Sequence, residues 1–385
     1  MGGDRRAVAA TLLAALAASQ AALVVLNPVL PEVAADLGIS IAAAGQLRTV
    51  SGLVAGATAL TAGLLAARIG LRELLGGGLA ILAVGSALSA AAPGFLVLAL
   101  AQALVGAGIG ISYSVAVAAA AEWVAPGDRS RVLAIALLGP PLAWIVGMPI
   151  VGVVGEASWR LAWIAVPLST ALVAGVLLAR RPPTPPASVR ADLWSVLVHP
   201  GVARWSTGEL LAFSGWAGSL VFMGALFVES YGLSIAATGF VLGFGALVYV
   251  PGNLLFRRWV DTHDRVLLVG LAVSAAATVV VLCLVRPTVW LSIALFAFLS
   301  FLAGGRTLAG SSRALHLAPS LRLGVTGVRT AALQLGYFVG AAVGGAALGV
   351  GGYSGLGIAL GLLFVAATIP HLWPGPVSAP APPLP

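Results

Sequence analysis

Residues 63–72 read Gly63-Leu64-Leu65-Ala66-Ala67-Arg68-Ile69-Gly70-Leu71-Arg72. The stretch closes the second of about twelve apolar segments and places two arginines where the chain leaves that segment. Arginine is costly inside hydrocarbon and gathers in the short loops on one side of a bilayer. The loop therefore predicts a tight connection between two membrane-spanning helices.

The composition indicates that most of the chain lies in lipid. Of its 385 residues, 60% are hydrophobic and 8% are charged, and the mean hydropathy is +1.07. Soluble domains carry about 25% charged residues. Backbone groups in hydrocarbon must bond internally, so apolar segments of about 20 residues are expected to be helices. We predict an all-α polytopic membrane protein, which leaves no room for a sizeable soluble domain.

One long polar break, residues 180–206, divides the apolar segments into six plus six. We expect an N-terminal six-helix bundle (1–181), a cytoplasmic Pro/Arg-containing linker (182–204), a C-terminal six-helix bundle (205–373) and a disordered tail (374–385). The predicted transmembrane helices are 7–27, 45–67, 74–92, 95–120, 131–154, 160–179, 207–229, 235–256, 265–285, 288–311, 325–350 and 354–372.

The positive charge has a topological explanation. All 20 basic residues are arginines, the net charge is +8, and only Arg48, Arg160 and Arg286 fall on or near one side of the predicted membrane. The arginine-rich side is therefore predicted to be cytoplasmic, and an even number of helices places both termini there. A nucleic-acid partner is not expected, because no basic patch is interleaved with aromatic residues.

The loop at 63–72 resembles the signature loop of the major facilitator superfamily, G-x-L-A-D-R-x-G-R-R. Gly63, Arg68, Gly70 and Arg72 match that pattern, whereas the usual aspartate is Ala67. The resemblance implies two pseudo-symmetric six-helix bundles around a central cavity, with this loop acting as a cytoplasmic gate.

Further stretches resemble the drug:proton antiporter branch of that superfamily, and within it the sugar- and nucleoside-efflux permeases. Residues 139–152 and the Ser158-Trp159-Arg160 that follows are similar to G-x-P-x-G and G-W-R-x-x-F. Residues 27–40 are similar to the L-P-x-I-A-x-D-L-G-x-S entrance of the branch. The resemblance implies export of a small compound.

The two halves also resemble one another. The 63–72 loop is echoed by Gly252-Asn253-Leu254-Leu255-Phe256-Arg257-Arg258, and the glycines of 106–110 by Gly304-Gly305. Such parallel repeats are typical of transporters whose substrate site lies between the halves near the bilayer midplane.

Two charges that proton-coupled relatives usually carry are missing here. Ala67 replaces the loop aspartate, and Gln102 stands where the fourth helix usually has an arginine. The remaining acids lie at predicted helix ends or in loops, and Glu209, Glu229 and Glu32 come closest to membrane depth. For each of the three there are two alternatives: the acid is a solvated charge at a helix end, or it couples transport to protons.

Arginines inside predicted helices need a partner or must snorkel to the interface. Arg48, Arg306 and Arg329 are in this position. Snorkelling or pairing with an acid explains all three, and Arg306 is the best of them for contact with an anionic substrate or a gate partner.

Uncharged polar and aromatic residues deep in the central helices are candidates for the cavity wall, since amides and phenols orient a ligand and indoles supply apolar area. Packing or interhelical hydrogen bonding is the alternative for each. The candidates are Gln20, Gln102, Tyr113, Trp144, Ser214, Trp216, Asn253, Gln334 and Tyr337.

We therefore expect a monomeric secondary active transporter of a bacterial inner membrane that exports a small amphipathic or hydrophobic compound, coupled to protons. The expected partners are that small molecule, the bilayer and protons. The alternatives are an uncoupled facilitator or importer of the same fold, and a non-transporting membrane receptor or assembly factor. No enzymatic activity, cofactor or metal is expected, because the sequence shows no catalytic set and no lysine for a phosphate loop.

Overall fold

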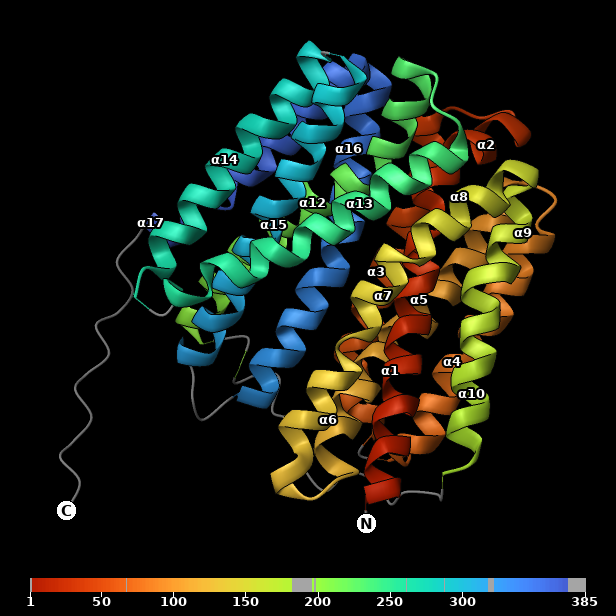
Figure 1. The fold of residues 1–385 in the computed structure, drawn as a ribbon, viewed down its shortest axis with the longest axis vertical. Coiled ribbons are helices and arrows are strands. Elements are labelled where there is room, and N and C mark those ends of the chain that lie inside the picture. The colour runs from red at the N-terminus through yellow and green to blue at the C-terminus, as the bar shows by residue number, and fades with distance from the viewer. Residues whose placement is uncertain are drawn as a thin grey trace.

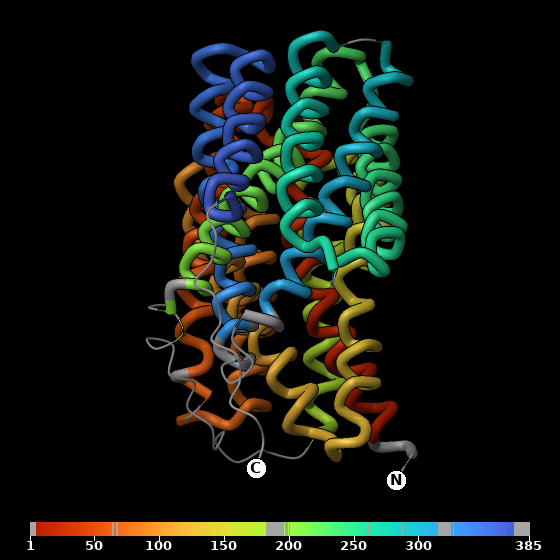
Figure 2. The backbone as a smooth tube through the Cα atoms, turned by 90° about the vertical axis from the view of Figure 1, so that its left-hand side faces the viewer, coloured from red at the N-terminus to blue at the C-terminus, as the bar shows by residue number. Residues whose placement is uncertain are grey.

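The computed structural model describes residues 2–66, 68–181, 196, 199–260, 262–286, 288–317 and 322–372. Ala67, most of the predicted linker and the predicted tail lie outside these residues. The described chain is helical almost throughout, and its helices form two groups that stand side by side in Figure 1. Figure 2 shows the molecule after a turn of 90° about the vertical axis, with one group in front of the other.

The N-terminal group contains the helices coloured red to yellow-green in Figure 1. They are α1 (Gly2–Val24), α2 (Leu26–Asp36), α3 (Ile41–Ala66), α4 (Leu71–Ala91), α5 (Phe95–Glu122), α6 (Arg129–Ala136), α7 (Gly139–Ile145), α8 (Gly147–Ala157), α9 (Trp159–Trp163) and α10 (Ser169–Ala179), with a 3-10 turn at Pro126–Asp128 and a π-turn at Ile164–Leu168.

The C-terminal group contains the green to blue helices (Figure 1). They are α12 (Pro200–Tyr231), α13 (Ile235–Leu255), α14 (Asp264–Val285), α15 (Val289–Leu317), α16 (Arg322–Ala366) and α17 (Ile369–Leu372), with a 3-10 turn at Phe256–Arg258.

These helices make up twelve membrane spans. Ten stretches of the described chain are long and apolar enough to cross a bilayer. One of them, Gly327–Leu372, has 46 residues, or about 69 Å of helix, and is therefore two spans that turn back at Gly352. The twelfth is α3, whose 26 residues connect the first and third spans. The predicted twelve-helix, all-α fold is confirmed.

Several helix boundaries differ from the predicted ones, and prolines account for most differences. The sequence predicts that the first helix ends at Asn27. In the structure α1 ends at Val24, and α2 begins at Leu26 and continues through Pro31 to Asp36. The predicted linker ends early, because α12 begins at Pro200, and proline is favoured in the first turn of a helix.

The sequence predicts the fifth and sixth spans as continuous α-helices, but the structure shows both of them interrupted. The fifth is broken into α6, α7 and α8, and the sixth contains the π-turn around Pro167. Proline removes a backbone donor and obstructs the preceding turn, so interruptions of this kind are expected next to it.

Glycine allows the helices of each group to approach closely. A Cβ on Gly106 of α5 would collide with the backbone of Ser51 in α3, and one on Gly85 of α4 would lie 2.7 Å from the Val105 nitrogen. Lipid provides no hydrophobic drive for helix association, so close van der Waals contact has to supply it. Large apolar side chains such as Trp290, 78% exposed, instead face outward toward the acyl chains.

The two groups touch tightly at the end where α2 leads into α3. Gly52 of α3 packs on the backbone of Phe338 in α16, and Gly224 of α12 packs on the backbone of Asn27. Gln46 Nε2 donates to the Ala341 carbonyl at 3.4 Å across the same boundary. These contacts close that end of the interface between the halves.

Candidate functional site

A cavity of about 390 Å³ lies between the two groups of helices, with walls contributed by both. Seven of the nine predicted wall residues line it. Further residues, which were not named as wall candidates from the sequence, line it as well. The wall consists of Gln20, Leu23, Tyr113, Pro140, Pro141, Trp144, Phe213, Trp216, Leu220, Ala246, Tyr249, Val250, Asn253, Leu254, Thr307, Arg329, Thr330, Leu333, Gln334 and Tyr337.

The N-terminal side of the cavity presents a hydrogen-bonded amide and indole. Trp144 Nε1 of α7 donates to Gln20 Oε1 of α1 at 3.1 Å. Pro140 and Pro141 precede this tryptophan and interrupt the fifth span, which turns α7 toward the cavity. The bond fixes both side chains and leaves the amide nitrogen of Gln20 available to a ligand.

The C-terminal side is mainly aromatic. Trp216 stacks on Tyr249 with a ring-centroid distance of 6.0 Å, and Phe213 meets Tyr337 edge to face at 5.6 Å. Gln334, only 4% exposed, has a side-chain oxygen with no hydrogen-bond partner. This side of the cavity is thus mainly aromatic, and the Gln334 oxygen is a polar atom that a ligand could satisfy.

Two predicted wall residues lie elsewhere. Gln102 of α5 is fully buried among helices and donates to Ser89 Oγ of α4 at 3.0 Å. Ser214 of α12 donates to the Leu210 carbonyl of its own helix at 2.7 Å. Both are polar residues that bond to neighbouring helix atoms, which was the alternative stated for each candidate, and neither is among the residues that line this cavity.

Of the wall residues that the sequence did not mark as wall positions, four are polar: Tyr249, Thr307, Arg329 and Thr330. Helical spacing could have identified Arg329. It precedes Leu333 by four residues and Tyr337 by eight, so all three share one face of α16. Residues of a helix that share a face with a wall residue belong to the same wall.

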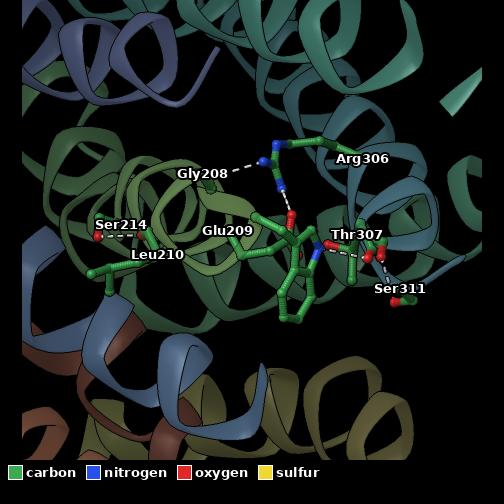
Figure 3. A network of polar contacts seen from close by, with 9 residues as sticks. Gly208, Glu209, Leu210, Ser214, Arg306, Thr307 and Ser311 are labelled. Carbon is green, nitrogen blue, oxygen red and sulfur yellow. Dashed lines mark hydrogen bonds and ion pairs between the residues drawn. The ribbon is translucent and has the colours of Figure 1, made fainter. Parts of the chain in front are cut away.

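Arg306 and Glu209 form a buried ion pair beside the cavity rather than in its wall (Figure 3). Arg306 Nη1 donates to Glu209 Oε1 at 2.5 Å, and Nη2 donates to the Gly208 carbonyl at 3.0 Å. The carboxylate packs against Gly310, where a Cβ would lie 2.5 Å from Glu209 Cδ. The pair connects α12 to α15, and it lies nine residues after the start of α12 and eleven residues before the end of α15.

The other two candidate acids are not near the cavity wall. Glu229, near the end of α12, accepts a 2.7 Å hydrogen bond from the Tyr353 hydroxyl. Glu32 is exposed near the end of α2. Neither is positioned as a buried proton carrier, so Glu209 is the one of these three candidates that is buried inside a span.

Arg48 of α3 is fully buried between the halves on the closed side. One guanidinium nitrogen donates to the Leu23 carbonyl, and the guanidinium carbon lies 5.8 Å from the centre of the Tyr337 ring. The arginine therefore does not snorkel but contacts the helix opposite it in the other half.

The loop around 63–72 lies at the end of the molecule remote from the closed side. Arg68 is exposed, and Gly70 precedes the first residue of α4 with an extended ψ of 147°. Arg72 Nη2 donates to the Ala179 carbonyl at the end of α10 at 3.3 Å. This bond joins helices within one half.

Comparison with known families identifies the class. Residues 12–265 and 206–385 match the Major Facilitator Superfamily. Together with the two six-helix groups and the cavity between them, this shows that the chain belongs to the Major Facilitator Superfamily: it is a multi-pass membrane transporter and not an enzyme.

Individual relatives are distant. The chain is 28% identical over 262 residues to the transcription regulatory protein OpdE of Pseudomonas aeruginosa, a match that covers 66% of this chain and 65% of OpdE. It is 26% identical over 342 residues to a chloramphenicol efflux pump of Mycobacterium tuberculosis, covering 82% of this chain and 79% of the pump.

The fold is also found in a solved structure. A bacterial homologue of the human lysosomal transporter Spinster, in an inward-facing and unoccupied conformation, superposes with a TM-score of 0.72 over 95% of this chain and 94% of that one. At 14% identity the likeness concerns the fold alone.

Proposed function

We propose that this protein exports a small amphipathic or hydrophobic compound across a bacterial inner membrane by alternating access. The observation that carries the proposal is the cavity between the halves, with aromatic walls and few polar atoms. Efflux agrees with the name of the chloramphenicol pump to which the chain is similar. The closed end would be the outer one, because the arginine-rich loops lie at the opposite end.

Glu209 is the residue to which we assign proton coupling. Its carboxylate is 2% exposed and lies inside a membrane span, held by the Arg306 charge and next to Thr307 of the cavity wall. A proton arriving at Oε1 would neutralise the carboxylate and end the ionic part of the pair. Arg306 would keep its bond to the Gly208 carbonyl, and α12 would be free to move against α15.

The test is uptake into everted membrane vesicles of chloramphenicol and of a panel of other drugs, sugars and nucleosides. The proposal expects uptake of at least one compound that collapses when an uncoupler removes the proton gradient. Uptake that persists unchanged with the uncoupler, and counterflow without any gradient, would instead establish the facilitator. The neutral Gln102, bonded to Ser89, is the observation that favours this second candidate.

Glu209→Gln separates the two mechanisms further. For a coupled exporter the variant retains exchange of compound across the membrane but loses accumulation against a gradient. Asp128→Asn is the matched control, since the Asp128–Arg5 pair is only partly buried, with side chains 36% and 33% exposed. If reconstituted protein moves no compound while a protein partner co-purifies, the chain has a regulatory role, which the name of the relative OpdE brings into consideration.

A further inference from the structure

Arg329 is the charged residue in the wall of the cavity. It lies about two turns after the start of α16. No carboxylate among the described residues lies within ion-pair distance of its guanidinium, and its buried Nε has no hydrogen-bond partner. The other 19 wall residues include no aspartate, glutamate, lysine or histidine. The cavity therefore carries one uncompensated positive charge.

The two other arginines of membrane depth are accounted for differently. Arg306 has Glu209 as its partner, so its charge is neutralised. Arg48 is completely buried behind the wall, against the Leu23 carbonyl and the Tyr337 ring. A cation at bilayer depth is unfavourable unless paired, and such residues mark substrate pathways. Arg329 alone of the three faces the space where a ligand would enter.

The surroundings of Arg329 are suited to an anion attached to an apolar body. Tyr113, from the N-terminal half, and Tyr249, from the C-terminal half, line the same cavity as Arg329. The phenol hydroxyl of tyrosine can donate a hydrogen bond to an anionic oxygen, as can the amide NH₂ of asparagine or glutamine. The indoles of Trp144 and Trp216 supply apolar surface in the same cavity.

We propose that Arg329 binds an acidic group of the transported compound, so that the substrate is an amphipathic anion such as an aromatic carboxylate or sulfonate. This inference rests on the proposed export function and narrows its substrate class. The ligand would supply the counter-charge that the protein lacks, with its apolar part between the aromatic walls. Binding of that charge from both halves would also draw the two groups of helices together.

The experiment uses two probes of one skeleton, 8-anilinonaphthalene-1-sulfonate and the uncharged N-phenyl-1-naphthylamine. Equilibrium dialysis against the full chain in nanodiscs, with empty nanodiscs subtracted, gives both dissociation constants. Arg329→Gln should weaken the sulfonate about tenfold, which corresponds to about 1.4 kcal/mol, and change the neutral probe less than twofold. Arg329→Lys should keep most of the sulfonate affinity.

Arg265→Gln is the charge-matched control, because Arg265 is exposed at the start of α14 and away from the wall. It should leave both probes unaffected. Equal weakening of both probes in Arg329→Gln, or no weakening of the sulfonate, would overturn the anion site. Selective sulfonate binding without transport of any compound would keep the site and overturn export. If Arg329→Gln exports neutral compounds at full rate and the wild type shows no selective sulfonate binding, export is kept and the anion site is overturned.

Discussion

Glu209 Oε1 of α12 lies 2.5 Å from Arg306 Nη1 of α15, and the two side chains are 2% and 6% exposed. Two opposite charges are thus removed from water inside one half of the protein, directly beside the cavity. Such a pair contributes little net stability when intact, but it is strongly destabilising when one member is lost. Removal of either charge by mutation is therefore expected to destabilise this half of the protein.

Glu209→Gln should lower the stability of the folded protein by about 3 to 5 kcal/mol, because it leaves the Arg306 charge buried and uncompensated. Thermal unfolding of the purified protein in detergent measures the change. Asp128→Asn, in the partly exposed pair with Arg5, should cost about 0 to 1 kcal/mol. Equal effects of the two variants would contradict the burial of the Glu209 pair.

Removal of both charges should recover part of the loss. In Glu209→Gln combined with Arg306→Met, the buried cation is gone as well, so the double variant should be more stable than Glu209→Gln alone. Additive losses would mean that the two residues stabilise the fold independently.

Trp216→Leu should weaken binding of N-phenyl-1-naphthylamine about tenfold or more. The indole stacks between Tyr249 and Phe296, with centroid distances of 6.0 and 6.4 Å, and a fully buried aromatic contact is worth about 1.5 to 3 kcal/mol. Equilibrium dialysis measures the affinity. Trp290→Leu on the lipid face is the control and should bind the probe normally; a similar loss there would refute a specific contact with Trp216.

Gly52→Val should open the closed end of the interface. A Cβ at Gly52 would lie 2.5 Å from the backbone nitrogen of Phe338, and backbone atoms have no flexible end that can move aside. Distances between spin labels on α3 and α16 should shift toward longer values in this variant. Gly77→Val, where a Cβ would meet nothing within 4 Å, should leave the distribution unchanged.

The ion pair of Asp36 with Arg160 should add stability at neutral pH and lose this contribution only in acid. Hydrogen bonds from Arg160, at 2.6 Å, and from Trp159, at 3.2 Å, lower the pKa of the Asp36 carboxyl below its ordinary value of 3.8. A lowered acid pKa adds stability that is present above pH 3.8 and is lost as the pH falls through the folded-state value. Melting temperatures of wild type and Asp36→Asn should therefore differ by a constant amount from pH 5 to 8 and converge below about pH 4. Convergence near neutral pH would contradict this assignment.

Single cysteines test the proposed orientation. The natural Cys283 is fully buried and should react little with maleimides, so the wild-type chain is a suitable background. Pro93→Cys, in the loop between α4 and α5, should be labelled in intact cells. Gly127→Cys, between α5 and α6, should be labelled only after the membrane is opened or inverted. The opposite pattern would place the termini outside.

Much of the fold could be predicted because bilayer thickness sets the length of each apolar segment. The number of spans, the break before α12 and the turn at Gly352 follow from residue type along the chain. Boundaries near Pro31 and Pro167 could not be predicted well. Proline can end a helix or be accommodated within it, and neighbouring helices decide which occurs.

The sequence by itself determined the class of protein and which polar residues lie at membrane depth, since both depend on local composition and spacing. Only the tertiary structure decided their partners. It brought Glu209 to Arg306 across 97 residues and Gln20 to Trp144 across 124, and it left Arg329 facing the cavity without an acid. The physical reason is that an arginine in hydrocarbon requires a partner that compensates its charge. Which residue becomes that partner depends on which helices meet, and this is decided by packing between distant segments.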